Sequence, residues 1–206
     1  MNIEIKKSIK PVNYLDALKT LEERVDKLIK NEANELIWIL EHPPTFTAGT
    51  SYSESDVLDK SINIIKTSRG GKITWHGPGQ LVCYLVINLN KRKKDIRKFI
   101  NIIEESIIES LKTFGLDTYS DRKNIGIWTN YKNEEKKIAA IGIKVKKWIT
   151  YHGFSININN SISNYKKIIP CGIKDKPVTT LKSIYNQKYN KLPEELIKNL
   201  ISNLKT

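Results

Sequence analysis

The sequence predicts an α+β fold in which a strand-rich middle is flanked by helices. Apolar side chains recur at helical spacing in three segments, and buried or alternating apolar runs typical of strands separate them. No internal repeat, low-complexity tract or linker divides the 206 residues. Because a chain of this length can bury a substantial core, we expect a single domain over residues 1–206.

The first third of the chain predicts one helix among short strands. Apolar positions at helical spacing predict a helix over residues 13–29, with Asn13 as its cap and Asp16 favourably placed in its first turn. Pro43 and Pro44 exclude a helix in the segment that follows the second strand. The expected strands lie at residues 1–10, 36–40 and 62–65.

Residues 69–89 are the stretch around which the chain is organised. The first half is a glycine-punctuated loop, in which Gly70, Gly71, Gly77 and Gly79 let backbone N–H groups approach a ligand. The second half, from residue 81 on, is an almost unbroken apolar run typical of a strand buried on both faces. A polar loop anchored to a buried strand is a favourable place for a functional site.

The remainder of the chain predicts two more helices and three strands. A helix with one apolar face spans residues 95–114 and stops at Gly115, and an amphipathic helix with Pro193 in its first turn spans residues 192–204. The strands are expected at residues 125–128, 137–146 and 148–158, with a polar turn at 131–135. Strand alternation places Trp148, His152, Phe154, Ile156 and Ile158 on one face.

Composition limits the possible functions. Lys and Arg number 35 against 22 acidic residues, a net charge of +13 that fits an acidic protein partner, a nucleic acid or an anionic membrane surface equally well. No apolar stretch approaches the ~20 residues that span a bilayer, and the first residues lack the features of a signal peptide. The two cysteines have no framework spacing, which fits a reducing cytoplasm, so we expect a cytoplasmic protein.

Cys171 and Lys137 are candidates for nucleophilic chemistry. Cys171 lies in a short Pro-Cys-Gly loop, whereas Cys83 lies inside the apolar strand, where a cysteine is usually inert. By strand parity Lys137 points toward the core, although a bulge would point Lys136 there instead. A partly buried lysine beside a cysteine lowers the pKa of the thiol. A solvated charge at a strand end is the alternative for Lys137.

The histidines and glycines suggest no cofactor. His76 and His152 each fit a base, a donor that positions substrate, or a core histidine. No zinc-ligand spacing, phosphate-binding loop of the Walker type or dinucleotide-binding fingerprint is present. We therefore expect neither a metal nor a cofactor.

Five segments of the chain, in order, resemble the lipoyl-octanoyl transferases. The principal one is Arg-Gly-Gly-Lys-Ile-Thr-Trp-His-Gly-Pro-Gly-Gln-Leu at 69–81, with Trp75 where the family usually has tyrosine. The others are Leu-Glu-His-Pro-Pro-Thr-Phe-Thr-Ala-Gly at 40–49, Lys-Ile-Ala-Ala-Ile-Gly-Ile at 137–143, His-Gly-Phe-Ser-Ile-Asn at 152–157 and Pro-Cys-Gly-Ile at 170–173. The resemblance covers about residues 36–184.

The resemblance implies the fold of the biotin and lipoate ligase catalytic domain, a mixed β-sheet with helices packed against it. It also implies that Cys171 accepts the acyl group and that Lys137 lowers the pKa of the Cys171 thiol. The family's substrate-contacting positions fall on Arg69, Gly70, Gly71, Lys72, Ile73, Thr74, Trp75, His76, Ala140, Ile141, Gly142, Gly153, Phe154 and Ser155. With Trp75 we expect the acyl tunnel to keep an aromatic wall but to lose a hydroxyl.

The implied reaction is transfer of an octanoyl or lipoyl group from acyl carrier protein to a lysine, by way of a Cys171 thioester, without a cofactor. The expected acceptors are lipoyl domains of 2-oxoacid dehydrogenase complexes and the glycine cleavage H protein. The nearest alternative is an ATP-dependent lipoate–protein ligase, which shares the fold but needs no nucleophilic cysteine. A nucleic-acid-binding module is a second alternative, but no recognition motif supports it. We expect neither nucleic acid nor a membrane as partner.

Overall fold

The computed structural model describes residues 2–172 and 176–205. The strands are β1 (Ile3–Lys7), β2 (Glu35–Leu40), β3 (Thr45–Ala48), β4 (Ile64–Lys66), β5 (Ile73–His76), β6 (Gln80–Asn88), β7 (Tyr119–Ser120), β8 (Ile127–Tyr131), β9 (Glu134–Lys146) and β10 (Ile149–Asn157). The α-helices are α1 (Tyr14–Ile29), α2 (Ile96–Lys112), α3 (Leu181–Ile184) and α4 (Leu192–Asn203). Short 3₁₀ helices are η1 (Glu54–Asp56), η2 (Leu89–Lys91), η3 (Ser163–Lys167) and η4 (Pro170–Gly172).

Two sheets organise these elements. The larger is seven-stranded and mixed, in the order β1-β2-β6-β10-β9-β8-β7, and only its β1–β2 pair is parallel among the described strands. The smaller has three strands in the order β4-β3-β5. Every residue of β6 and β10 is buried, because helices cover both faces of the larger sheet at its centre. The predicted α+β fold with a mixed sheet is confirmed.

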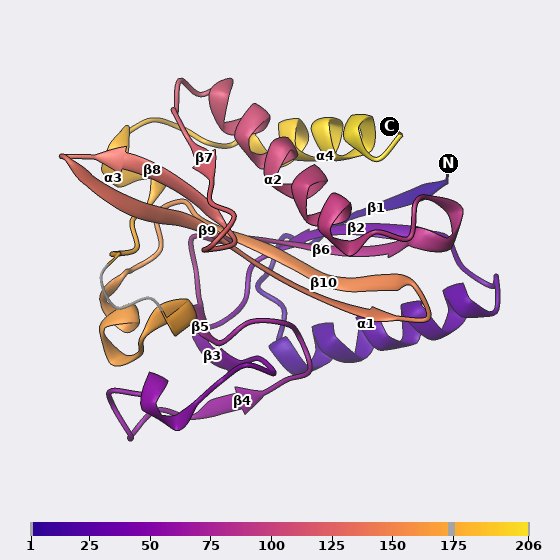
Figure 1. Ribbon diagram of the computed structural model, residues 1–206, viewed down its shortest axis with the longest axis horizontal. Helices are drawn as coiled ribbons and strands as arrows, with labels where there is room; N and C mark the ends of the chain where they lie inside the picture. Colours follow the sequence, from indigo (N-terminus) through magenta and orange to yellow (C-terminus); the bar gives the residue numbers. More distant parts are fainter. Residues whose placement is uncertain (1, 173–175, 206) are drawn as a thin grey trace.

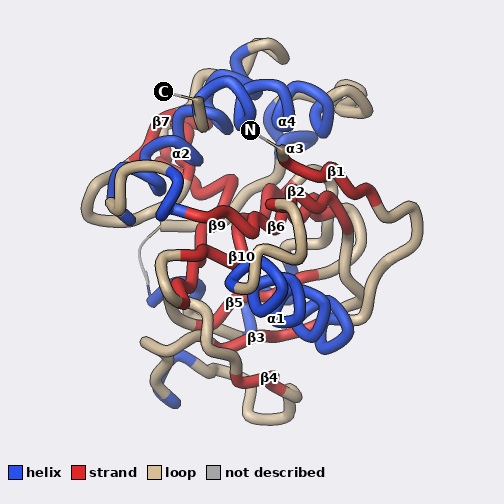
Figure 2. The backbone as a smooth tube through the Cα atoms, turned by 90° about the vertical axis from the view of Figure 1, so that its right-hand side faces the viewer, coloured by secondary structure: helices blue, strands red, loops and turns tan. Residues whose placement is uncertain are grey.

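The helices divide between the two faces of the larger sheet. Helices α2 and α4 lie side by side over one face, while α1 and the smaller sheet lie on the other side (Figures 1 and 2). The apolar stripe of α1 packs on alternate side chains of β2, β6 and β10, and the intervening side chains of these strands face α2 and α4. The core therefore has two layers with β6 and β10 between them.

The helix boundaries agree with the capping predicted from the sequence. The side chain of Asn13 accepts a hydrogen bond from the Leu15 N–H at 2.9 Å, and α1 starts at the next residue, Tyr14. Helix α2 ends two residues earlier than predicted, and Gly115 follows it with a left-handed φ of 74°. The capping residues in the sequence thus predict the start of α1 and, to within two residues, the end of α2.

The structure differs from the sequence-based expectation in the short strands. Strand β5 lies in the segment predicted to be a glycine-punctuated loop, and β3 lies in a segment from which only a helix was excluded. The sequence does not signal these strands because each has only four residues and finds its partner far along the chain. The turn predicted at 131–135 is a tighter hairpin, in which Lys132 and Asn133 adopt left-handed φ values of 55° and 60°. Strand β9 accordingly starts at Glu134 rather than at residue 137.

No helix within the described ranges, 2–172 and 176–205, is long and apolar enough to cross a membrane.

Candidate active site

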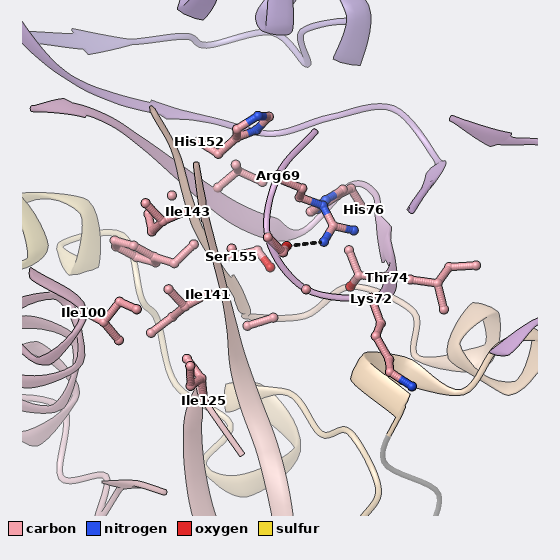
Figure 3. Close-up of a pocket in the computed structure, with 18 of the residues that line it drawn as sticks. Arg69, Lys72, Thr74, His76, Ile100, Ile125, Ile141, Ile143, His152 and Ser155 are labelled. Atoms are coloured by element: carbon pink, nitrogen blue, oxygen red, sulfur yellow. Dashed lines mark hydrogen bonds between the residues drawn. The ribbon is translucent and has the colours of Figure 1, made fainter. Parts of the chain in front are cut away.

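A cavity of about 340 Å³ opens between β9, β10, the loop before β5 and the first turns of α1 and α2 (Figure 3). Isoleucine side chains, among them Ile100 and Ile141, enter it from one side. Arg69, Thr74 and His76 lie on the opposite side. The cavity can therefore hold an elongated apolar group and presents polar groups along one wall.

The cavity gathers positions that are far apart in the sequence. Nearly all of the positions predicted to contact substrate line it, namely Arg69, Gly70, Gly71, Lys72, Ile73, Thr74, His76, Ala140, Ile141, Gly142, Gly153, Phe154 and Ser155. They meet because β9 and β10 pair with Gly142 opposite Gly153. Whether these residues bind substrate stays a prediction.

Trp75 is the predicted position that does not line the cavity. Its ring packs edge-on against Tyr165, with 5.9 Å between ring centroids, in a separate cluster that includes Ile168. Strand alternation explains this, since Thr74 and His76, on either side of Trp75, both line the cavity. The expectation that Trp75 forms a wall of the acyl tunnel is therefore not met.

Arg69 anchors the glycine-rich loop. Its guanidinium donates hydrogen bonds to the Thr47 carbonyl oxygen at 2.8 Å, to Thr47 Oγ1 at 2.9 Å and to the Gly70 carbonyl oxygen at 3.0 Å. These bonds tie the loop to β3, and Arg69 is itself buried. Arg69 thus holds the loop in place as well as lining the cavity.

His152 lies on a different face from the one that strand alternation predicts. Its left-handed φ of 64° turns the ring onto Tyr151, at 5.0 Å between centroids, and toward Tyr84, at 6.3 Å. Phe154 and Ile156 pack on the other face, in the layer of α2 and α4. The predicted common face of His152, Phe154 and Ile156 is wrong, because one left-handed residue interrupts the alternation.

Tyr14, His76, Tyr84 and His152 line one end of the cavity, which we call its inner end. This end is polar, and Arg69 is the charged side chain beside it. His42 contacts the Val12 carbonyl oxygen through Nδ1 at 2.6 Å, so Nδ1 carries the proton and Nε2 accepts from the Tyr84 hydroxyl at 2.7 Å. Burial lowers the pKa of His42 and holds that of His76 and His152 at about 3. All three histidines of the chain are therefore neutral at neutral pH.

Two polar atoms at this inner end have no hydrogen-bond partner among the described residues. They are the hydroxyl of Tyr14 and Nε2 of His152, and both residues are buried. Both residues also line the cavity. A ligand that reaches them meets polar groups that need partners.

Lys137 is buried at the end of the cavity nearest β8, with 5% of its surface exposed. Its Nζ donates to the Ile125 carbonyl oxygen at 2.8 Å and lies 5.0 Å from the centre of the Trp128 ring. Lys136, the alternative considered from the sequence, instead pairs with the exposed Glu134 at 2.8 Å. The inward direction predicted for Lys137 by strand parity is therefore confirmed.

Cys171 lies in η4, but its side chain and residues 173–175 are outside the part that the structure describes. Backbone hydrogen bonds hold the described residues before and after this segment. The Ile169 N–H donates to the Asp56 carbonyl oxygen at 2.7 Å, and Lys137 bonds through its backbone to Pro177 and Thr179, at 2.9 Å each. The described chain after residue 175 therefore lies beside Lys137 at Pro177 and Thr179.

A second lysine, Lys72, lies beside Gly172. A Cβ built on Gly172 would lie 2.4 Å from Lys72 Nζ, so the Lys72 ammonium packs against the residue that follows Cys171. Buried Asp56 holds this ammonium at 3.4 Å. Cys83, by contrast, is fully buried in β6, where burial raises the pKa of its thiol and makes it unreactive.

Some cavity residues could not be found from the sequence. Tyr84 looked like part of an apolar core strand, and Tyr14, Ile100 and Ile125 looked like ordinary apolar positions of a helix or strand. The signal for His42, which backs the cavity through Tyr84, was its place in the Glu-His-Pro-Pro segment beside a strand end.

Comparison with known proteins decides between the families that share this fold. The profile of the lipoyl protein ligase A/B catalytic domain matches residues 13–204. An octanoyltransferase from Wolbachia sp. subsp. Brugia malayi is 45% identical over 174 residues, which cover 84% of this chain and 85% of the relative. The chain belongs to the octanoyltransferase family. As such it is an acyltransferase, and octanoyl transfer in protein lipoylation is its activity.

Solved structures show how the octanoyltransferase fold relates to that of the ligases. A lipoate-protein ligase A bound with ATP matches with a TM-score of 0.73 at 16% identity, covering 100% of this chain and 86% of that one. A bi-partite lipoate protein ligase from Thermoplasma acidophilum matches with a TM-score of 0.74 at 15% identity, covering 100% and 84%. The expected lipoate ligase-like fold is confirmed, and at these identities the likeness concerns the fold alone.

Proposed function

We propose that the chain takes the octanoyl group from octanoyl acyl carrier protein and delivers it to a lysine of a lipoyl domain. Residues 1–206 would act together as one catalytic domain in the cytoplasm, where thiols stay reduced. The observation that carries the proposal is the buried ammonium of Lys137, held at the end of an apolar cavity beside the chain that follows Cys171. The bi-partite lipoate protein ligase from Thermoplasma acidophilum, which is described with its E2 lipoyl domain, supports an acceptor of this kind.

The first half-reaction forms an acyl-enzyme. The Cys171 thiolate attacks the thioester carbonyl of the donor, and the bond from the carbonyl carbon to the carrier's sulfur breaks. The carrier leaves as a thiol after taking a proton from the Lys137 ammonium, which leaves Lys137 neutral. The Lys137 ammonium stabilises the thiolate before attack. Exchange of one thioester for another is nearly neutral in free energy, so no nucleotide is required.

The second half-reaction makes the amide. The ε-amine of the acceptor lysine attacks the Cys171 thioester, a C–N bond forms, and the Cys171 thiolate leaves. Lys137, neutral at that moment, takes the proton of the incoming amine as general base. Amide formation from a thioester is downhill and drives the sequence forward. Backbone N–H groups near Gly142 or Cys171 are the candidates for stabilising the oxyanion in both steps.

The apolar wall of the cavity suits a saturated chain. Each buried methylene contributes about 0.8 kcal/mol, so the seven carbons beyond the carbonyl contribute roughly 5 kcal/mol. Ile100, Ile125 and Ile141 are placed to make these contacts. The net charge of +13 also favours encounter with acidic carrier and lipoyl domains, and an association rate that does not fall with added salt would count against this part of the proposal.

The test replaces the nucleophile. Cys171→Ser and the wild type are mixed with octanoyl acyl carrier protein and a lipoyl domain, without nucleotide, and octanoylated lipoyl domain is measured. We expect transfer by the wild type and almost none by Cys171→Ser. Full activity of the variant, or transfer that needs free octanoate and ATP, would favour a lipoate–protein ligase instead.

A further inference from the structure

The peptide group between Ile125 and Gly126 is held from both sides by buried charged side chains. Its carbonyl oxygen accepts the hydrogen bond from Lys137 Nζ at 2.8 Å. Its N–H donates to Glu104 Oε1, on α2, at 3.5 Å. Glu104 and Lys137 expose only 8% and 5% of their surfaces. One peptide group therefore connects the carboxylate to the ammonium.

Glu104 has no obvious structural reason to be charged. It lies on α2 between Ile103 and Ile107, whose side chains belong to the core, and a carboxylate is retained in such a place only where something compensates its charge. Glu104 and Lys137, both of which the structure describes, form no salt bridge with each other, and each instead bonds to the Ile125–Gly126 peptide. Burial above all, and then the negative charges of Asp121 and Glu105, raise the pKa of Glu104. The Gly126 N–H and the positive charge of Lys137 act in the opposite direction and favour the ionised carboxylate.

Glycine at position 126 permits this arrangement, and a residue with a side chain would not fit there. A Cβ there would lie 2.5 Å from Lys137 Cε and 3.0 Å from Nζ, and the φ of Gly126 is 137°. The absence of a side chain lets the lysine run along the backbone and reach the carbonyl oxygen of the preceding residue.

We propose that Glu104 is a positioning residue for the reaction, which fixes the Lys137 ammonium through the Ile125–Gly126 peptide. When a carboxylate accepts a hydrogen bond from the N–H of a peptide group, the carbonyl oxygen of that peptide group becomes more negative. Hydrogen bonds linked in this way strengthen one another. The strengthened carbonyl holds the ammonium at the wall of the cavity, beside Pro177 and Thr179, whose backbones bond to Lys137. The inference rests on the proposed function in so far as Lys137 is the reactive lysine.

Glu104→Gln tests the proposal, and Glu105→Gln is the matched control. Glu105 is the next residue of the same helix, carries the same charge and is exposed. Two quantities are measured: the pH midpoint for alkylation of Cys171 by iodoacetamide, and the rate of octanoyl-enzyme formation per active site from octanoyl acyl carrier protein. The number of active sites, from the amplitude of acyl-enzyme formation, corrects for any loss of folded protein.

The direction in which the alkylation midpoint shifts distinguishes a positioning role of Glu104 from a direct electrostatic effect of its charge on the thiolate. Removing a negative charge near the thiolate by itself moves the alkylation midpoint to lower pH. Releasing the ammonium from its place moves it to higher pH, and this is the result we expect for Glu104→Gln. We also expect the rate of acyl-enzyme formation to fall about tenfold, the effect of losing one hydrogen bond to a charged group. A midpoint that falls, or matches that of Glu105→Gln, overturns the proposal.

A second variant disturbs the same geometry without touching the carboxylate. Gly126→Ala places a Cβ against Lys137 and is expected to move the midpoint in the same direction as Glu104→Gln. An unchanged midpoint in a folded Gly126→Ala protein contradicts the proposal. Failure of the proposed function looks different, since the wild type itself then forms no octanoyl-enzyme.

Discussion

Replacing Lys137 by methionine separates the chemical role of the lysine from its structural role. Methionine keeps an unbranched side chain in the buried space and removes the ammonium. The lost interactions are the bond to the Ile125 carbonyl oxygen, about 1.5–3 kcal/mol for a charged donor, and the contact with the Trp128 ring, about 0.5–2 kcal/mol. The variant also avoids the cost of burying an ammonium, which is several kcal/mol.

These contributions nearly cancel, so we expect the free energy of unfolding to change by less than about 2 kcal/mol and Tm by less than about 8 °C. Acyl-enzyme formation from octanoyl acyl carrier protein should fall about 10²-fold or more, because the thiolate loses its cation and the leaving carrier sulfur loses its proton donor. Lys136→Met is the control, since Lys136 points outward to Glu134 and should retain nearly full activity. Equal activities of the two variants would refute the role assigned to Lys137.

Three further predictions concern stability, pH and chain length. Gly153→Ala places a Cβ 1.9 Å from the Cys83 carbonyl oxygen and should destabilise the protein by about 3 kcal/mol in urea denaturation; a change below 1 kcal/mol would contradict the tight β6–β10 contact. Because His76 and His152 have pKa values of about 3 when folded but ~6.5 when unfolded, their contribution to stability is complete above pH 6.5 and is lost as pH falls toward 3. Between pH 6 and 5 they should together lower the free energy of unfolding by roughly 2 kcal/mol, whereas a curve that is flat or rises there would contradict their burial as neutral groups. Tyr14→Phe removes an unpartnered hydroxyl from the inner end of the cavity and should raise the ratio of kcat/KM for dodecanoyl over octanoyl donor several-fold; an unchanged ratio would mean that longer chains do not reach this end.

The sequence predicted the larger features because each has many residues to signal it. The helical spacing of α1 and α2, the apolar run of β6 and the cap at Asn13 all appear in the structure close to their predicted bounds. Strand parity placed Lys137 inward, and the motifs that carry the family resemblance supplied most, but not all, of the residues that line the cavity.

What the sequence could not predict depends on single backbone angles and on distant partners. One left-handed residue, His152, moved a ring to the opposite face of β10, and no pattern of apolar residues reports a φ angle. Trp75 turned away from the cavity because four residues of the predicted loop form β5 and alternate. The Glu104 connection to Lys137 runs through a peptide on a third segment, so neither residue's neighbours in sequence could indicate it.

Mass spectrometry of the protein after mixing with octanoyl acyl carrier protein, followed by peptide mapping, tests the central claim most directly. The account predicts one octanoyl group, bound as a thioester to Cys171 and discharged when a lipoyl domain is added. Octanoylated lipoyl domain formed while Cys171 stays unmodified throughout, or an octanoyl group carried by another residue, would contradict it.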